Sequence, residues 1–376
     1  TNDGPSISIG TADSATALLT ETNAGLATSG TLSIADPDLN TASLTPNLLS
    51  VTTAGTTNGL NPALTANNNA ALLAMLQLNA GALSSGQGSL SWAFSSGTEA
   101  FNYLAAGESL TLTYSFSVSD PNGAASSPQS ITVTVNGSND GPQLTAAASD
   151  ILSGSVSELP DRDPAELRGI RSTSGVFSVA DLDRSDSLST SVSSSSSTVN
   201  PSRLAAGQTT LGTLIPSIAA NTTGGNPGSI AWTYSVADSA LDFLAAGQSL
   251  TETFSVTVSD GNGGSITQTI TVTLLGTNDG PSISIGTADS NAATLTETNA
   301  GLATSGTLSI ADPDLNTASL TPNLLSVSTS GITNGLLSSN ADLLAMLRLN
   351  AGALTNGQGS LSWTFSSGTE IGRAHV

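Results

Sequence analysis

Alternating hydrophobic and polar positions recur along this chain and predict β-strands. Residues 111–118 (TLTYSFSV) and 130–135 (SITVTV) alternate β-branched or aromatic residues with Ser and Thr, as half-buried strands do. Shorter strands are predicted at 6–10 and 31–35. Frequent Gly, Asn and Pro residues separate these segments, and short strands with such punctuation indicate a β-sandwich. The fold class predicted is therefore all-β.

Turn and helix signals complete this pattern. The segment 260–264 (DGNGG) predicts a hairpin turn, because Gly and Asn tolerate positive φ. Leu72, Met75 and Leu76 indicate one short amphipathic helix in a long loop, which recurs at 343–347. The serine run 193–197 is interpreted as a low-complexity loop.

The pattern occurs three times. Asn-Asp-Gly-Pro begins at Asn2, Asn139 and Asn278, which gives periods of 137 and 139 residues. We therefore expect three repeats: copy 1 (1–137), copy 2 (138–276) and copy 3 (277–370). Copy 3 matches copy 1 closely but has no counterpart of 101–136, so we interpret it as truncated. Residues 371–376 depart from the repeat and are interpreted as a tail that is not biological.

Composition narrows the possible chemistry. Charged residues are only 9% of the chain, and 28 acids against 7 bases give a net charge of −21. Nucleic acids and anionic membranes bind cationic surfaces, so neither is an expected partner. Because the chain has no Lys and no Cys, lysine and thiol chemistry are excluded. The single histidine, His375, lies in the tail, so histidine-dependent catalysis is not expected either.

Two further function classes are not expected. The longest apolar stretch, 70–76, is far shorter than the 18 or so residues of a membrane span, so no insertion into a membrane is predicted. Paired carboxylates can serve a glycosidase, but nothing in the sequence sets two of them across a cleft. We therefore predict that the protein is not an enzyme.

The acidic residues keep the register of the repeat. Of the 28 acids, 17 fall on recurring positions: an Asp in the linker, an Asp 11 residues after the linker Asn, a Glu 19 residues after it, an Asp-x-Asp pair, and an Asp before the hairpin turn. Scattered solubilising charge would not recur in this way. The carboxylates are therefore candidate functional groups.

Strand direction predicts where these groups lie. If the strand at 6–10 runs down from the linker, Glu21 lies at the lower pole of copy 1, and the strand at 31–35 returns Asp36 and Asp38 to the upper pole. The last strand runs down into the next linker, which places the hairpin containing Asp120 or Asp260 at the upper pole as well. Each linker is then surrounded by groups from both neighbouring copies. The first junction would comprise Glu21, Asn139, Asp140, Asp181, Asp183 and Asp260; the second, Glu158, Asn278, Asp279, Asp312 and Asp314; and the upper pole of copy 1, Asp3, Asp36, Asp38 and Asp120.

Such clusters repel unless a hard cation joins them. Calcium takes 6 to 8 oxygen ligands in flexible geometry, and Asp, Glu and Asn supply them. The competing interpretation is that these residues are helix caps, Asx-turns and solvated loop ends. The recurrence and the common pole favour calcium, so we predict Ca²⁺ at each junction.

Several segments resemble a known family. Residues 244–250 (LAAGQSL), 253–264 (TFSVTVSDGNGG) and 269–279 (TITVTLLGTND) are similar to the closing half of a VCBS repeat. The opening half is similar at 20–21 (TE) and 30–38 (GTLSIADPD). The resemblance implies tandem cadherin-like or immunoglobulin-like modules of a large RTX-type bacterial adhesin exported by type I secretion. The regions 54–88 and 193–228 exceed the family pattern.

These observations together predict structural extender repeats of a secreted bacterial surface adhesin. Calcium at the junctions would stiffen them, and they would support cell adhesion or biofilm formation. Their expected partners are the neighbouring repeats, with host or matrix glycans and proteins bound through other domains. Two alternatives stay open: a module that binds glycans or cells through its long loops and aromatic residues, and an accessory region of a secreted hydrolase.

Overall fold

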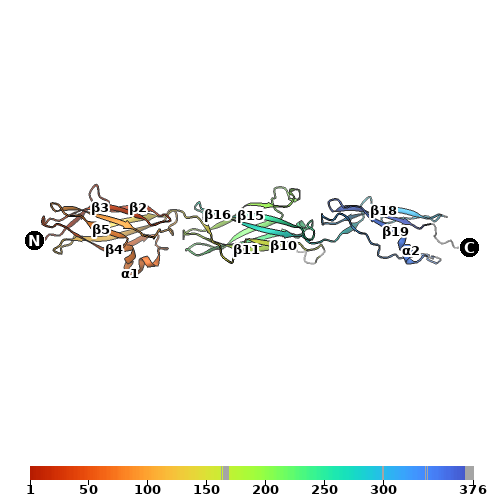
Figure 1. The fold of residues 1–376 in the computed structure, drawn as a ribbon, viewed down its shortest axis with the longest axis horizontal. Helices are drawn as coiled ribbons and strands as arrows, with labels where there is room; N and C mark the ends of the chain where they lie inside the picture. Colours follow the sequence, from red (N-terminus) through yellow and green to blue (C-terminus); the bar gives the residue numbers. More distant parts are fainter. Residues whose placement is uncertain (162, 164–168, 299, 335, 337, 369–376) are drawn as a thin grey trace.

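Three groups of β-strands follow one another along a single axis in the computed structural model of the chain (Figure 1). The structure describes residues 1–376 except 162, 164–168, 299, 335, 337 and 369–376. The predicted all-β fold with tandem sandwiches and short helices is confirmed. The repeat boundaries stay a prediction, and the proposed tail lies outside the described residues.

Copy 1 is a sandwich of two four-stranded sheets. One has the order β1 (Ser6–Ser8), β3 (Ala27–Ala35), β6 (Gln87–Ser95), β5 (Leu76–Ala80). The other has the order β2 (Thr16–Thr20), β8 (Gln129–Asn136), β7 (Ser109–Ser119), β4 (Thr45–Gly55). The inner faces form one hydrophobic core, as the alternating pattern predicted.

Copy 2 has the same architecture with its own core. Its sheets have the orders β13 (Thr213–Ala220), β14 (Gly228–Ala237), β11 (Ile170–Ala180), β9 (Gln143–Leu144), and β10 (Ser153–Ser157), β16 (Ser265–Leu275), β15 (Ser249–Ser259), β12 (Ser189–Ser197). Two 3₁₀ turns are present, η2 (Pro201–Arg203) and η3 (Asp238–Ala240). The loop predicted at 193–197 is wrong: these serines belong to β12, because β15 supplies backbone partners along its length.

Copy 3 forms one sheet in the described part of the chain. Its order is β17 (Ser282–Ser284), β18 (Ala303–Ala311), β20 (Gln358–Ser366), β19 (Leu347–Ala351). Residues 292–296 and 321–331 correspond to β2 and β4 of copy 1 but are not strands. In copy 1 these two strands pair with β8 and β7, which have no counterpart in copy 3. Strand formation at these positions therefore depends on the partner strand.

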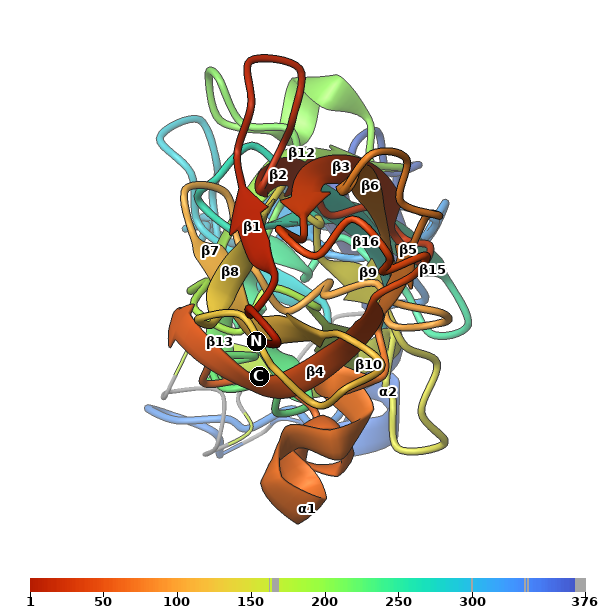
Figure 2. The same cartoon turned by 90° about the vertical axis from the view of Figure 1, so that its left-hand side faces the viewer.

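The short helices predicted for copies 1 and 3 are present. Helix α1 (Pro62–Leu73) protrudes from copy 1 (Figure 2) and is interrupted by three asparagines with positive φ, Asn67–Asn69. Helix α2 (Asn340–Ala345) is shorter. Met75 and Leu76, which the sequence assigned to the first helix, lie beyond its end, and Leu76 and Leu347 begin β5 and β19. Neither described helix is long and apolar enough to cross a membrane.

One tryptophan anchors each copy. Trp92 and Trp232 are each 1% exposed and Trp363 is 8% exposed, and each indole N–H donates a hydrogen bond to a backbone carbonyl. A glycine lies beneath each ring, and a Cβ there would come within 2.6 Å of the indole. The tryptophans are therefore core residues and not an exposed stacking surface.

Acidic residues that directly follow a strand lie at the poles of each module. Asp36 follows β3 and Asp181 follows β11, whereas Glu21 follows β2 and Glu158 follows β10. The sequence did not predict β2 and β10 as separate strands, but they run parallel to β8 and β16, toward the next linker. The predicted direction of the chain at both poles is thereby preserved.

Candidate cation sites at the module junctions

The first junction begins with a buried carboxylate. Glu21 is 2% exposed, and its Oε1 accepts hydrogen bonds from the backbone N–H and the hydroxyl of Ser138. The next two linker residues reach into copy 2. The Asn139 side-chain amide donates to Asp260 Oδ2 at 3.0 Å, and the Asp140 N–H donates to Asp183 Oδ2 at 2.8 Å. The linker therefore connects acids of both modules.

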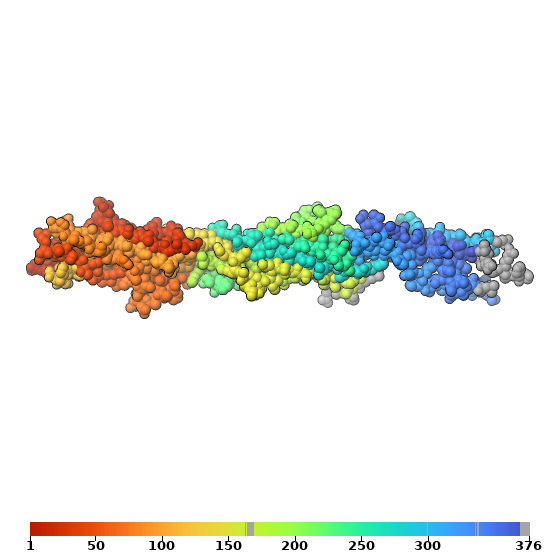
Figure 3. All heavy atoms as spheres, viewed as in Figure 1, coloured from red at the N-terminus to blue at the C-terminus, as the bar shows by residue number. Residues whose placement is uncertain are grey.

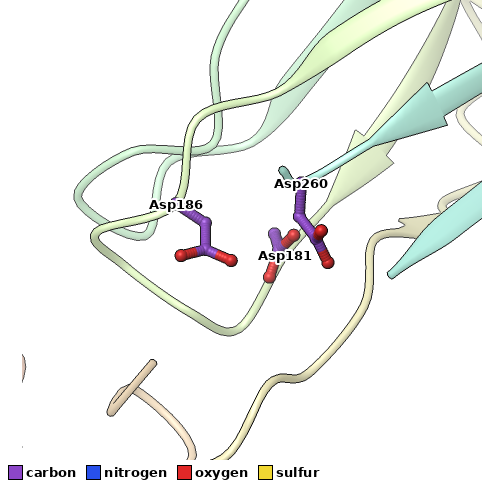
Figure 4. A group of neighbouring side chains, drawn as sticks. All are labelled: Asp181, Asp186 and Asp260. Atoms are coloured by element: carbon purple, nitrogen blue, oxygen red, sulfur yellow. The ribbon is translucent and has the colours of Figure 1, made fainter. Parts of the chain in front are cut away.

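Three aspartates of copy 2 meet at its upper pole (Figure 4). Asp181, Asp186 and Asp260 are 6%, 3% and 2% exposed, and one oxygen from each lies within 4.8 Å of the others. The hairpin turn between β15 and β16 fixes Asp260, because its Oδ1 accepts the backbone N–H groups of Asn262 and Gly264 at 2.7 and 3.0 Å. The Asn262 side chain also donates to Asp186 Oδ1 at 2.7 Å.

Several carboxylate oxygens at this junction lack a hydrogen-bond partner. These buried oxygens are Glu21 Oε2, Asp140 Oδ2, Asp181 Oδ2, Asp183 Oδ1 and Asp186 Oδ2. In all of these groups except Asp140, the other oxygen of the same carboxylate accepts one of the hydrogen bonds of the junction. A buried charge without a partner is strongly destabilising. Among the described residues the one ion pair joins Arg171 and Asp238, 3.6 Å apart, at the other end of copy 2. No basic side chain of the described chain pairs with these oxygens.

The pKa values of these carboxylates are raised, because they are buried and lie close to other acids. Burial, followed by the charges of Asp186, Asp260 and Asp140, raises the pKa of Asp181 to about 6. Burial and neighbouring aspartates likewise raise the pKa of Asp183 to about 7. The pKa of Asp140 is raised by burial and by the charge of Glu21 across the junction. The carboxylates of the two modules therefore influence one another.

The second junction repeats the arrangement. Glu158 is 1% exposed and accepts the Thr277 N–H at 2.8 Å, and the Asp279 N–H donates to Asp314 Oδ2 at 3.1 Å. Burial and the charges of Asp279, Asp242 and Asp238 raise the pKa of Glu158 to about 8. Asp312 holds the loop by accepting the Asp314 N–H at 3.0 Å. Asn278 differs from Asn139, because its amide donates to the Asp279 carbonyl and not to an acid of the neighbouring copy.

The upper pole of copy 1 has the same local geometry. The Asp3 N–H donates to Asp38 Oδ2 at 2.9 Å, and the Asp38 N–H donates to Asp36 Oδ1 at 2.8 Å. Asp120 Oδ1 accepts the N–H of Asn122 at 2.9 Å, as Asp260 does in copy 2. Asp36 and Asp120 each keep one buried oxygen without a hydrogen-bond partner. The acidic side chains named for the two junctions and for the upper pole of copy 1 therefore lie at strand ends and in linkers, and their role as metal ligands stays a prediction.

Some acids at the poles were not predicted. Asp186 lies at the position of Thr41 and Thr317, and Asp238 and Asp242 lie at the positions of Thr98 and Asn102. Asp161 donates its N–H to Asp279 Oδ1 at 2.7 Å. These acids occur in copy 2 alone, so a search for recurring positions passes over them. The signal that finds Asp186 is its spacing, three residues after the Asp-x-Asp pair.

One recurring aspartate does not belong to the poles. Asp13 Oδ2 accepts the backbone N–H groups of Gly10 and Ser33 and the hydroxyl of Ser33. These hydrogen bonds lower its pKa, and the same arrangement lowers the pKa of Asp150 and Asp289. This aspartate fixes a turn through one oxygen, Oδ2, to which the protein donates three hydrogen bonds. It shows what a structural carboxylate looks like in this fold, in contrast to the acids of the poles.

The donor set at the junctions fits a hard cation. It consists of oxygen ligands alone, with carboxylates and amides from both modules, and it includes buried oxygens that no protein group satisfies. Hard divalent cations bind such oxygen sets, whereas softer metals prefer nitrogen and sulfur. The first junction offers Glu21, Asp140, Asp181, Asp183, Asp186 and Asp260.

The chain is similar to several solved structures, at low sequence identity. No family model and no curated protein matches the sequence. Among solved structures, the CooA pilin subunit from enterotoxigenic Escherichia coli is 14% identical, with 36% of this chain and 98% of that chain covered and a TM-score of 0.25. Extracellular cadherin domains 1–4 of protocadherin gamma B7 are 11% identical over 96% of this chain and 67% of that chain, with a TM-score of 0.30. The D00-D0 domain of intimin is 12% identical over 71% of this chain and 98% of that chain, with a TM-score of 0.23.

Proposed function

We propose that this chain is a spacer: tandem β-sandwich modules of an extracellular bacterial adhesin that calcium stiffens at the junctions. Its VCBS-like segments support an RTX-type parent protein exported by type I secretion. Its partners would be the neighbouring repeats, and host or matrix glycans would be bound by other domains. The spacer would hold such domains away from the cell during adhesion or biofilm formation.

One observation carries the proposal. At the first junction, carboxylates of two modules converge on one linker, are buried there, and retain oxygens that no protein group satisfies. A solvated loop end would expose its carboxylates, and a structural turn would supply donors to the oxygen that it buries, as it does for Asp13 Oδ2. A bound cation accounts for both the burial and the missing partners.

Calcium binding at a junction would lower the free energy of one relative orientation of the two modules. A site with a dissociation constant of about 0.1 to 1 mM, as in extracellular modules, would stabilise the folded chain by roughly 1.4 to 2.7 kcal/mol at about 10 mM calcium. Several sites along the chain would add to this. The linkers then act as rigid connections because both neighbouring modules hold the same ions.

Calorimetry of the full chain tests the proposal. We expect calcium to raise the melting temperature and a chelator to reverse the change, with magnesium giving a smaller effect because it requires stricter octahedral geometry. Glu21→Gln and Glu158→Gln should reduce the calcium-dependent shift, since each removes a buried carboxylate from one junction.

Glu297→Gln is the matched control. Glu297 occupies the same position of the repeat but is exposed and lies at no junction of this structure. The variant should keep the full calcium response. A melting temperature that is the same with calcium and with chelator would refute the calcium-stiffened spacer, and an equal loss in all three variants would refute the assignment of the residues.

A further inference from the structure

The inner face of the copy 3 sheet is apolar, and no other strand among the described residues packs on it. A groove of about 410 Å³ runs over this face. All of its lining residues are uncharged, and the largest are Leu295, Leu308, Leu347, Leu349, Trp363 and Phe365. Phe365 is only half-buried, whereas Phe94 at the same position of copy 1 is 1% exposed. An exposed apolar groove of this kind marks a surface for association.

Copy 1 shows which element covers this face. Residues 303–327 are identical to residues 27–51, and β19 and β20 have the same inward residues as β5 and β6. In copy 1 the hairpin of β7 and β8 packs on this face, and the ring centroids of Phe94 and Tyr114 are 6.4 Å apart. Its buried side chains are Leu110, Leu112, Tyr114, Phe116, Ile131 and Val133. The open face of copy 3 therefore has the shape and chemistry that fit such a hairpin.

The segments that would pair with the hairpin are present in copy 3. In copy 1, β2 pairs with β8 and β4 pairs with β7. Residues 292–296 and 321–331 of copy 3 correspond to β2 and β4, but they are not strands. A hairpin added between them would give both segments backbone partners, as strand addition does in peptide recognition. The flat sheet of a second copy would not supply these hydrogen bonds, so a hairpin is the better occupant.

The linker asparagine at the second junction differs from the one at the first. In copy 2 the aspartate of the hairpin turn, Asp260, accepts the Asn139 amide at 3.0 Å. Copy 3 has no such hairpin among its described residues, and the Asn278 amide donates to the Asp279 carbonyl at 3.1 Å. A hairpin of the copy 1 type would bring its turn aspartate, Asp120, to this pole. One hairpin would therefore complete both the core and the linker contacts of copy 3.

The hairpin of copy 2 differs from that of copy 1 at one inward position. Glu252 of β15 is fully buried, and it accepts hydrogen bonds from the Tyr234 hydroxyl at 2.8 Å and from the backbone N–H groups of Leu211 and Gly212. Copy 1 has Leu112 at the position of Glu252. Each hairpin thus suits the sheet on which it packs.

Copy 3 has none of the groups that hold Glu252. Phe365 lies at the position of Tyr234, and a phenyl ring has no hydroxyl to donate. Helix α2 takes the place of the loop that supplies the N–H groups in copy 2. A hairpin of the copy 2 type would bury a carboxylate without these partners, which is strongly unfavourable. The open face of copy 3 therefore selects the copy 1 type.

We propose that the open face of copy 3 is an acceptor site for a β-hairpin of the copy 1 type that another polypeptide supplies. The hairpin lies between residues 292–296 and 321–331 and completes the second sheet of the sandwich. Its inward side chains are apolar or aromatic, and none of them carries a charge. This role goes beyond that of a spacer, because it makes copy 3 a point of attachment on the rod.

Titration of the full chain with synthetic hairpins tests the proposal. The matched peptide has the sequence of residues 101–136, and the mismatched peptide has that of residues 241–275. Isothermal titration calorimetry measures their affinities. We expect the matched peptide to bind in a ratio of one peptide per chain. Leu112→Glu in this peptide should weaken binding by about tenfold or more, because a polar group is buried without a partner. Glu252→Leu in the mismatched peptide should strengthen binding.

Amide hydrogen exchange locates the bound peptide. We expect slower exchange at residues 292–296 and 321–331, because both segments gain strand partners. Exchange at 45–55 should stay the same, because β4 is already paired in copy 1. In the chain, Leu349→Arg places a charge on the open face and should abolish binding. Arg348→Gln is the matched control, because this residue is exposed on the opposite face of β19, and it should leave binding unchanged.

Three results would each overturn the proposal. The first is no binding of the matched peptide, or equal affinities with leucine and glutamate at position 112. The second is slower exchange at 45–55 in place of 321–331, because the peptide would then replace the hairpin of copy 1. The third is a dimer of the chain alone, seen by sedimentation, that slows exchange in the same segments, because the occupant would then be a second copy.

The peptide variants leave the chain unaltered, so misfolding of a chain variant cannot produce these results. The titrations are run both with calcium and with chelator. The order of the four peptide affinities should be the same in both conditions. Failure of the calcium-stiffened spacer would therefore leave this test intact, and failure of the acceptor site would leave the spacer intact.

Discussion

A single aspartate distinguishes the upper pole of copy 2 from the other two. Asp186 closes a cluster with Asp181 and Asp260, whereas copies 1 and 3 have Thr41 and Thr317 at its position. Thr41 is itself only 6% exposed, so the position is buried in both kinds of module. One residue therefore changes the number of carboxylates at a pole, and under the proposed function it would also change the affinity for calcium.

Asp186→Thr should weaken calcium binding at the first junction by about tenfold, because ligand charge count sets the affinity of such sites. Isothermal titration calorimetry of the full chain measures this. Thr41→Asp is the reciprocal variant, and it should strengthen binding at the upper pole of copy 1. Titration curves that coincide with those of the unaltered chain would show that Asp186 takes no part.

A buried carboxylate in the core of copy 2 has a different role. Glu252 is fully buried and accepts hydrogen bonds from the Tyr234 hydroxyl, at 2.8 Å, and from the backbone N–H groups of Leu211 and Gly212. Copy 1 has Leu112 at its position. The protein itself thus supplies every partner of Glu252, and this carboxylate fixes the loop before β13.

Tyr234→Phe should destabilise copy 2 by about 1 to 3 kcal/mol, because it removes a hydrogen bond and leaves a buried carboxyl oxygen with one donor fewer. Urea unfolding, followed by the fluorescence of Trp232, measures the change. Tyr114→Phe in copy 1 removes a hydrogen bond to the neutral Leu72 carbonyl and should cost less. Equal losses in the two variants would contradict a special contribution of the Tyr234–Glu252 hydrogen bond to the stability of copy 2.

At the scale of elements, alternation predicted the long strands but not their partners. Residues 111–118 and 130–135 read correctly as β7 and β8 because both alternate over their full length. The run 193–197 has no apolar residue, and its place in β12 comes from pairing with β15. Residues 321–331 and the β4 strand are almost identical in sequence yet differ in structure, because only β4 has a partner. The local sequence pattern does not determine which strands pair in the tertiary structure.

The candidate site, like the strands, could be predicted only in part from the sequence. Recurrence and strand direction located Glu21, Asp181 and Asp260, because each follows or precedes a strand whose direction is fixed by the linkers. Asp238 and Asp186 occur once, and only the packing of the loops brings them to the poles. A repeat reveals what the copies share, whereas the differences between junctions require the structure.

The raised pKa values of acids at the poles predict an unusual dependence of stability on pH for the calcium-free protein. Asp181, Asp183 and Glu158 have pKa values raised to about 6, 7 and 8, so the folded state binds protons that the unfolded state releases above about pH 4. Stability should therefore fall as pH rises from about 4 to 8. With calcium present the trend should be opposite over this range, because protons compete with the ion. Melting temperatures of metal-free and calcium-loaded protein across this range provide the measurement, and parallel curves would contradict it.

At the scale of the whole molecule, the modules form a single continuous rod (Figure 3). The net charge of −21 is not spread evenly over this rod, because the recurring acids gather at the poles of the modules. The connection between modules is a linker of a few residues, and its hydrogen bonds to the poles are made by carboxylates. The rod therefore depends on the same groups that repel one another when no cation is bound.

Small-angle scattering of the full chain should detect this dependence. We expect the maximum dimension to be largest with calcium and the scattering of the chelated chain to show a flexible ensemble of bent shapes. Sodium chloride at about 1 M shortens the Debye length to about 3 Å, but it screens exposed charges far more than buried ones. Salt alone should therefore fail to restore the extended form, because Asp183 and Glu158 are at most 1% exposed and need a ligand inside the junction. If salt straightened the chelated chain as fully as calcium does, diffuse repulsion between the poles would replace specific binding as the physical basis of the rod.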